Sequence, residues 1–210
     1  MTLLYWNCRG LWRASAVRSL KDVTKSHHPQ ILRLIETKKK RKAWERLRLQ
    51  LGFRNCFAVD RFGLSGGLAL LWKEGIDVNL RSYSRFHIDV DVKIEKSFRF
   101  TLFYGNPVSN RRKESWDLLR QLNQGWEGPW LIAGDFNEVR FSWEARGVRD
   151  KDMSRMRQFN EVLDQCGLLD MGFAGSPFTY SNKRSYPFEA KARLDRVLGN
   201  IQMKNLMSSQ

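Results

Sequence analysis

Short apolar runs alternate with segments of helical period along the N-terminal part of the chain. Residues 3–6 and 31–35 are the apolar runs, and each predicts a buried strand. Between them, apolar side chains recur at helical spacing over residues 16–23, and Pro29 ends the helix that this spacing predicts. A second, short helix is predicted over residues 43–51. The N-terminal part is therefore expected to form strand, helix, strand and helix in that order.

The middle of the chain has the period-two alternation that is typical of strands. An apolar run at 68–72 predicts one strand, and residues 88–94 alternate apolar with charged side chains, which predicts a strand with one face in water. The alternation continues over 98–102 after a turn at 95–97. These two segments are expected to pair as a hairpin.

The C-terminal part mixes both periods. It holds an amphipathic segment at 111–122, a strand at 130–133, a helix at 153–166 and short strand-like pieces at 178–181 and 194–198. No repeat and no long linker interrupts the chain, so a single domain over residues 1–210 is predicted. Strands with antiparallel character between helices indicate a layered α/β fold, with two sheets packed together and covered by helices.

Acidic and amide side chains stand where the predicted strands end. They follow apolar runs along the chain and are Asn7, Glu36, Asp135, Asn137 and Asp195. A polar residue directly after a buried strand lies at the carboxyl edge of the sheet, where open α/β sheets bind their ligands. Oxygen donors at such an edge suit a hard cation such as Mg²⁺ and the phosphate that it would hold.

Each of these side chains also has a purely structural alternative. Glu36 could form an ion pair with Lys38 instead of binding a metal. Asp135 and Asn137 would point into one site if their strand continued through Phe136, but they could equally form an Asx turn with their own backbone. The sequence leaves both alternatives open.

Aromatic side chains add candidate contacts for a phosphate or a nucleic acid, whereas the histidines are excluded from catalysis. Tyr104 ends a predicted strand, so its hydroxyl could reach a phosphate oxygen, or its ring could simply close the core. Trp12 and Trp143 lie outside the apolar runs and are candidates for contact with a nucleic acid. None of the three histidines stands in an Asp-His pair, so none is assigned to catalysis.

The chain has a formal net charge of +15. An excess of this size favours a polyanionic partner, either a nucleic acid or an acidic membrane face, although a solvated basic surface without a partner is the alternative. The longest basic run, residues 38–42, starts two residues after Glu36, which favours phosphate binding near the proposed metal site. The same run is also compatible with a nuclear-import signal.

Cysteine usage and hydropathy indicate the compartment. The three cysteines lack any zinc-ligand spacing, which fits a reducing intracellular environment. No leader segment is evident, and no apolar stretch approaches the roughly 18 residues that a membrane span needs. We expect an intracellular, nuclear protein that does not enter a membrane.

Seven short motifs occur in a familiar order. They are Trp6-Asn7-Cys8-Arg9-Gly10, Glu36-Thr37-Lys38, Ser65-Gly66-Gly67-Leu68-Ala69, Phe103-Tyr104-Gly105, Gly134-Asp135-Phe136-Asn137-Glu138, Phe178-Thr179-Tyr180-Ser181-Asn182 and Arg193-Leu194-Asp195-Arg196. Together they resemble the endonuclease/exonuclease/phosphatase superfamily, and most of all the endonuclease domain of plant non-LTR (LINE-type) retrotransposons. The resemblance implies a DNase-like four-layer α/β sandwich of two packed mixed sheets flanked by helices. It also implies hydrolysis of a DNA phosphodiester that depends on Mg²⁺, or on Mn²⁺, and a nick that primes reverse transcription.

The resemblance assigns roles by position. Asn7 and Glu36 resemble the metal-site pair, Tyr104 the phosphate-contacting tyrosine, Asp135 and Asn137 the acid and amide at the scissile phosphate, and Asp195 the later acidic residue. The expected DNA-binding residues are Arg9, Lys38, Lys39, Lys40, Arg41, Asn182 and Arg193. The expected partners are DNA and, in a full-length parent, a reverse transcriptase domain, with this chain as a monomer.

The chain departs from the family pattern in two places. Tyr180 stands where the family has a tryptophan, and a last strand with a Ser-Asp-His motif is missing before Gln210. The sequence therefore predicts a fragment or decayed copy without its last strand, and losing a general acid or base typically slows catalysis by about 10²- to 10⁴-fold. The alternatives are a nucleic-acid-binding remnant without catalysis and a phosphatase acting on inositol phosphates or another small phosphoester.

Overall fold

The computed structural model describes residues 2–63, 65–147 and 152–208. It divides into two compact units, Met1–Leu102 and Phe103–Gln210, and each is described by itself. Among the described residues, none of the helices combines the length and the apolar character that crossing a bilayer requires.

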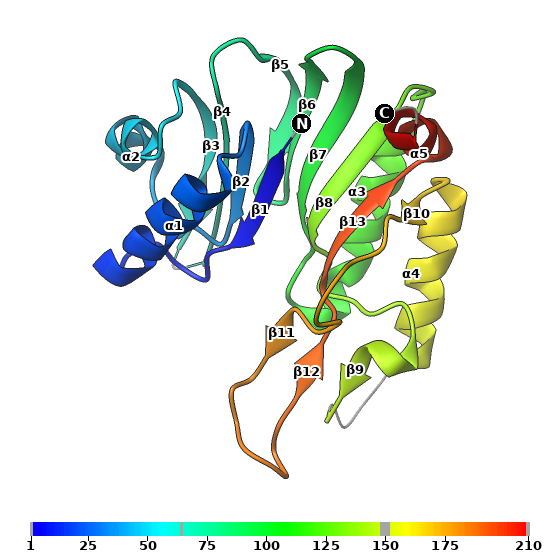
Figure 1. The fold of residues 1–210 in the computed structure, drawn as a ribbon. Coiled ribbons are helices and arrows are strands. Elements are labelled where there is room, and N and C mark those ends of the chain that lie inside the picture. Colours follow the sequence, from blue (N-terminus) through cyan, green and yellow to red (C-terminus); the bar gives the residue numbers. More distant parts are fainter. Residues whose placement is uncertain (1, 64, 148–151, 209–210) are drawn as a thin grey trace. The chain divides into compact units, whose positions relative to one another are not determined.

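Unit 1 contains seven strands and two α-helices within its described residues (Figure 1). The strands are β1 (Leu3–Asn7), β2 (Ile31–Ile35), β3 (Asn55–Phe62), β4 (Ser65–Trp72), β5 (Asp77–Ser84), β6 (His87–Lys93) and most of β7 (Ser97–Tyr104). The helices are α1 (Ala14–His27) and α2 (Trp44–Gln50), and a short 3-10 helix, η1 (Arg41–Ala43), precedes α2.

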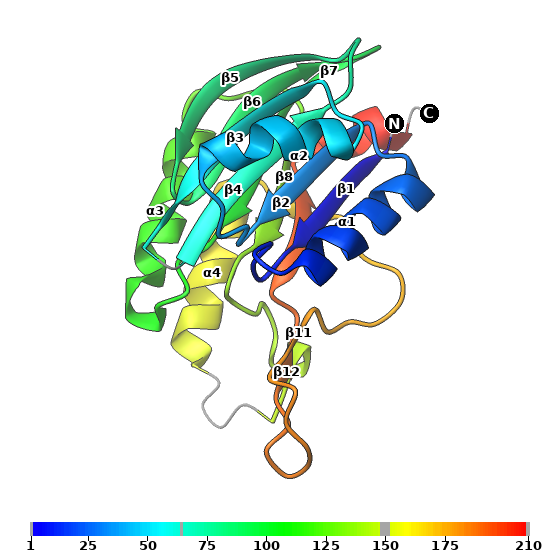
Figure 2. The same ribbon diagram turned by 90° about the vertical axis from the view of Figure 1, so that its left-hand side faces the viewer.

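The first sheet has the order β1-β2-β4-β3, with β1 and β2 parallel and the other pairs antiparallel. Both of its faces are covered within unit 1. Helices α1 and α2 lie over one face (Figure 2), where Leu20 and Trp44 join Leu34 of β2 in a buried cluster. On the other face, the guanidinium of Arg33 lies 4.5 Å from the ring centroid of Phe100 on β7. Because both faces are covered, every residue of β2 is buried, as its apolar run predicts.

Unit 2 holds the remaining elements. Its α-helices are α3 (Arg112–Asn123), α4 (Met153–Gln165) and α5 (Ile201–Ser208); a 3-10 helix, η2 (Ser109–Arg111), precedes α3, and another, η3 (Ser142–Glu144), precedes β9. The strands are β8 (Trp130–Asp135), β9 (Ala145–Arg146), β10 (Leu169–Asp170), β11 (Tyr180–Ser181), β12 (Lys191–Ala192) and β13 (Asp195–Gly199). Strand β8 pairs with β13, which pairs with β10, and β9, β11 and β12 form a small sheet of their own.

The core of unit 2 lies between β8 and helices α3 and α4. Trp130 and Ile132 of β8 pack in one buried cluster with Trp116 of α3 and Phe159 of α4. Phe136, directly after β8, stacks on Phe103 with a ring-centroid distance of 5.0 Å. The chain leaves β8 through this core, so the position of the strand end is fixed by packing on both sides of it.

In hydrogen-bonded order, the second sheet is β10-β13-β8-β7-β6-β5. Over the described residues the chain has an α/β fold with two mixed sheets and five α-helices. The predicted strands and helices are confirmed, with ends that shift by a few residues.

Two full-length strands were not expected from the sequence, β3 and β5. Each lies at the edge of its sheet; β5 has only exposed and partly exposed residues, and β3 has one buried residue, Ala58. An edge strand with exposed side chains carries few buried apolar residues, so its period-two signal is weak.

A buried ionic network joins three segments of unit 2. Arg196 on β13 donates to Glu144 with an Nη1 to Oε1 distance of 2.8 Å, and both side chains are fully buried. Arg193 donates to the same carboxylate and to Asp170 on β10, the latter at 2.8 Å. Burial alone would raise the pKa of Glu144, but the hydrogen bond and charge of Arg196, with the nearby backbone amides, hold it below its ordinary value.

Replacing Glu144 tests this network. We expect Glu144→Ala to lower the free energy of unfolding by about 3–5 kcal/mol, because it leaves buried guanidinium groups without their partner. Since the pKa of Glu144 is lowered on folding, its contribution is present above the ordinary carboxyl pKa of about 4.3 and is lost as the pH falls through the lowered value. Acid unfolding of the variant should therefore be less steep, as measured by urea titrations at several pH values.

The exposed Glu161 of α4 provides a matched control in the same unit. Glu161→Ala should change the free energy of unfolding by no more than about 0.5 kcal/mol. Equal losses in the two variants would show that the buried network has no special role.

Candidate active site

Asn7 and Glu36 stand at the carboxyl edge of the first sheet. Asn7 is the last residue of β1, and Glu36 directly follows β2. The two strands are parallel, and their register sets Asn7 opposite Ile35. The two side chains therefore follow neighbouring strands at the same edge, as the sequence predicts.

The backbone around Glu36 is held in a left-handed conformation, with φ of 50°. Cys8 N donates to Ile35 O at 3.0 Å on one side of it, and Thr37 N donates to Gly67 O at 3.1 Å on the other. Non-glycine residues with positive φ persist where the surrounding contacts over-determine them. The half-buried Glu36 carboxylate thus projects from a backbone that its neighbours fix on both sides.

The Asn7 side chain is fixed locally, because its Oδ1 accepts a hydrogen bond from Arg9 N at 3.2 Å. Burial and, secondly, the negative charge of Glu36 raise the pKa of the Cys8 thiol well above its ordinary range. Cys8 therefore stays a neutral thiol at physiological pH. The donors that follow β1 and β2 at this edge are an amide oxygen and a carboxylate.

This donor set fits Mg²⁺, which binds through one or two protein oxygens and keeps several of its waters. Within residues 2–63, 65–147 and 152–208, no group of three or more His, Cys, Asp or Glu side chains is placed to hold a metal ion. The residues that fit a divalent cation in unit 1 are Asn7 and Glu36.

In unit 2, two carboxylates face each other across a strand pair. Asp135 ends β8, Asp195 begins β13, and the antiparallel register sets them directly opposite each other. Directly opposed residues project from the same face of a sheet, and like charges at such positions repel. A divalent cation bound beside such a pair would lower that repulsion.

Asn137 does not follow the geometry expected from strand alternation. Strand β8 ends at Asp135, and Asn137 has φ of 54°, so the premise that the strand continues through Phe136 is wrong. Asn137 N donates to Asp135 Oδ1 at 2.9 Å, which is the Asx turn considered as the alternative. Its side-chain amide donates to Gly105 O at 2.8 Å and ties this loop to the residue after Tyr104.

The end of β7 lies unusually close to β8. A Cβ atom on Gly134 would lie 1.7 Å from the carbonyl oxygen of Phe103, so only glycine fits at this position. The close approach lets Gly105 N donate to Asp135 O at 2.7 Å. Tyr104 is thereby set beside the end of β8, where it is 6% exposed.

Thr179 has a positioning role to which sequence reasoning gave no weight. Its Oγ1 accepts hydrogen bonds from the backbone N–H groups of Leu194 and Asp195, both at 3.0 Å. One hydroxyl thus fixes the backbone on which the Asp195 carboxylate is mounted. The Phe178-Thr179-Tyr180 motif was the available signal, but the partners of the hydroxyl are remote in sequence.

Two residues expected to bind DNA, Arg193 and Asn182, form hydrogen bonds within the protein instead. Arg193 is 6% exposed and bonds Glu144 and Asp170, so the structure argues against a direct contact with DNA. Asn182 is occupied within the β11–β12 hairpin, where its side chain donates to Phe188 O and accepts from two backbone amides. A positive charge or an amide in the sequence does not reveal such intramolecular partners.

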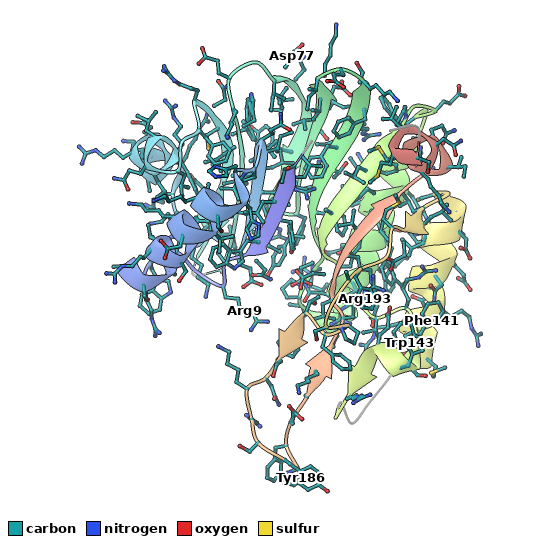
Figure 3. The ribbon with its side chains drawn as sticks, viewed as in Figure 1. Arg9, Asp77, Phe141, Trp143, Tyr186 and Arg193 are labelled. Carbon is teal, nitrogen blue, oxygen red and sulfur yellow. The ribbon has the colours of Figure 1, made fainter. Side chains whose placement is uncertain are left out.

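The other expected contact residues lie at the surface of unit 1. Arg9, Lys40 and Arg41 are exposed, while Lys38 and Lys39 are partly exposed. Figure 3 shows Arg9 at the periphery of unit 1. Their DNA contacts stay predictions.

The aromatic candidates are also accessible. Trp12 is 65% exposed and Trp143 is 57% exposed. The ring of Trp143 stacks on Phe141 at a centroid distance of 5.9 Å, and both are labelled in Figure 3. At the tip of the β11–β12 hairpin, Tyr186 is 92% exposed.

Three of the solved structures with similar folds are described here. The 3′ phosphatase NExo from Neisseria, as a single-residue variant bound to a product DNA hairpin, is 17% identical with a TM-score of 0.73, covering 98% of this chain and 88% of that one. The endonuclease domain of TRAS1, a telomere-specific non-LTR retrotransposon, is 16% identical with a TM-score of 0.70, covering 97% and 86%. An AP endonuclease from Archaeoglobus fulgidus is 15% identical with a TM-score of 0.71, covering 95% and 86%.

At these identities the structural likeness establishes the fold. No curated protein matches the sequence. The model of the endonuclease/exonuclease/phosphatase family, in contrast, matches residues 4–204, which is nearly the whole chain. The chain therefore belongs to the endonuclease/exonuclease/phosphatase family.

Proposed function

We propose that this protein hydrolyses phosphodiester bonds of DNA with the help of a divalent cation, as an endonuclease of the non-LTR retrotransposon type. The observation that carries the proposal is the cross-strand pair of Asp135 and Asp195, in a chain that belongs to this family of hydrolases. Two acids on one face, fixed by backbone register, are suited to proton transfer at a phosphate.

Glu36 and Asn7 are the residues that would hold Mg²⁺ or Mn²⁺. The bound cation would act as a Lewis acid that stabilises charge on the phosphate oxygens. Glu36 supplies the single carboxylate and Asn7 an amide oxygen, and the fixed backbone at Glu36 limits the reorganisation that binding requires.

Asp135 is the proposed proton-transfer group. The backbone N–H of Asn137 donates a hydrogen bond to Oδ1 of Asp135, and this bond orients the carboxylate. In that orientation it can take a proton from an attacking water or give one to the leaving oxygen. Asp195 stands opposite it on a backbone held by Thr179, and Tyr104 is the proposed phosphate contact.

DNA as the substrate is supported by charge and by likeness. A net charge of +15 favours a polyanion, and the NExo neighbour is described in a complex with product DNA. The retrotransposon assignment rests on the motif resemblance and on the likeness to the TRAS1 endonuclease domain. In this proposal the chain acts beside a reverse transcriptase domain in its parent protein.

A second candidate is a nucleic-acid-binding remnant without catalysis. The observation that favours it concerns the histidines. His87 is buried between the hydroxyls of Ser82 and Ser84, at 3.0 and 2.9 Å, and His27 and His28 lie at the end of α1. The candidate acids lie at the ends of β2, β8 and β13, and none of the three histidines lies at one of these positions. The candidate site residues therefore do not include a histidine. A phosphatase for small phosphoesters is the third candidate, and phosphate release without DNA cleavage would favour it.

Nicking of supercoiled plasmid tests the proposed activity. Wild-type protein should nick the plasmid in Mg²⁺ and not in EDTA, and Glu36→Ala or Asp135→Ala should slow nicking by at least about 10²-fold, because each removes a proposed catalytic group. The exposed Glu45 of α2 provides the control, and Glu45→Ala should retain the wild-type rate.

Equal nicking by the wild type and both variants would indicate a contaminating nuclease and would contradict the proposal. DNA binding without nicking by the wild-type protein would favour the second candidate.

The positioning role of Thr179 makes a separate prediction. Thr179→Val keeps the shape of the side chain but removes the acceptor for the amides of Leu194 and Asp195, so kcat for nicking should fall between about 10- and 100-fold with little change in KM. Thr179→Ser keeps the hydroxyl and should retain most of the activity. If valine and serine variants had the same kcat, the hydroxyl would have no part in holding Asp195.

A further inference from the structure

A pocket of about 530 Å³ lies in unit 1, lined by Trp12, Lys38, Lys40 and Arg61. We propose that this Trp12 pocket binds one nucleotide of single-stranded DNA, with the base stacked on Trp12 and the phosphate held by the three cationic side chains. The inference rests on the proposed function and specifies the form of DNA that the protein takes. The volume falls within the range of about 300–1,000 Å³ that is usual for small-ligand sites.

The lining is selective in its chemistry. One indole and three cationic side chains form it, and no carboxylate belongs to it among the described residues. A ligand with a planar ring and an attached anion can contact the indole and the cationic side chains together. A nucleotide is such a ligand. A peptide or lipid headgroup could also use the cations, but a nucleotide joins an anion to a flat base that matches the exposed face of the indole.

Trp12 is held in place although it is 65% exposed. A Cβ atom on Gly10 would lie 2.7 Å from Cδ1 of the indole, so the ring rests against the backbone at a residue with φ of 104°. The guanidinium of Arg13 lies 4.4 Å from the ring centroid. Exposed but anchored, the ring offers a stacking surface that loses little conformational entropy on binding.

The cationic side is also preorganised. Lys38 N donates to Gly66 O at 3.0 Å, and Arg61 N donates to Lys39 O at 3.4 Å, which ties the basic segment to β3 and β4. The guanidinium of Arg61 is further fixed by a 2.7 Å hydrogen bond to Gly63 O. Three charges on a fixed backbone bind a phosphate at a smaller entropic cost than three charges on a flexible tail.

Helix α1 adds positive potential beside Trp12. Its N-cap residue, Arg13, makes no side-chain capping bond, and its first turn contains no acidic residue. Unfilled N–H groups and the helix dipole favour an anion at this end of the helix.

The position of the pocket along the chain relates it to the proposed metal pair. Lys38 follows Glu36 by two residues, a separation of at most about 7 Å between their Cα atoms. A phosphate on Lys38 would thus belong to a nucleotide close to the one at Glu36. A base can lie on Trp12 only if it leaves its own stack, which favours a single strand over a duplex.

Binding without cleavage tests the pocket. In EDTA, fluorescence anisotropy would compare a short thymidine oligonucleotide with an abasic oligonucleotide of the same length, which has the phosphates but no bases. Wild-type protein should prefer the thymidine strand by about 5- to 100-fold. Trp12→Ala should bind the two equally, whereas Tyr83→Ala, which removes an exposed aromatic ring of β5 outside the pocket, should keep the preference.

A second variant tests the phosphate side. Arg61→Ala should weaken both oligonucleotides alike and reduce the slope of log affinity against log salt by about one, whereas Arg46→Ala, an exposed arginine of α2 outside the pocket, should weaken them less. Circular dichroism of each variant would establish that it folds.

A base preference that survives Trp12→Ala would overturn the inference, and so would equal binding of the two oligonucleotides by the wild-type protein. Preference for thymidine monophosphate over the oligonucleotide would also overturn it, by identifying a free nucleotide as the ligand. Because no cleavage occurs in EDTA, these outcomes are independent of whether the protein nicks DNA.

Discussion

Backbone register in two strand pairs is the constraint on which the proposed chemistry depends. The parallel pair β1–β2 sets Asn7 opposite Ile35, one residue before Glu36, and the antiparallel pair β8–β13 sets Asp135 opposite Asp195. A slip of one residue in either pair would turn a candidate side chain to the other face of its sheet. In each unit the register is secured by burial, since β2 and β8 are covered along their whole length.

Hydrogen bonds and ion pairs fix the backbone around the candidate site residues, in addition to apolar packing. The buried pair of Arg196 and Glu144 holds the residue next to Asp195, and the Thr179 hydroxyl holds the Asp195 backbone itself. Loops after the strands carry left-handed non-glycine residues, among them Glu36 and Asn137. Such conformations persist because several hydrogen bonds fix them, and they limit the reorganisation that a bound phosphate would require.

The sequence predicted the strand ends well and the loop geometry poorly. Apolar runs locate buried strands, so the positions of Asn7, Glu36 and Asp135 at strand ends followed directly from the sequence. Edge strands β3 and β5 were missed because an exposed strand has little hydrophobic alternation.

Residues whose roles depend on remote partners could not be predicted in the same way. The left-handed backbone of Asn137 and the two amides bound by Thr179 arise from tertiary contacts, as does the burial of Arg193 against Glu144. The most direct measurement of the central claim is a double-mutant cycle on the rate of DNA nicking, with Asp135→Asn, Asp195→Asn and both together. If the two groups serve one reaction, the double variant should be about as slow as the slower single variant. Rate losses that multiply would show two independent effects and contradict a shared catalytic role.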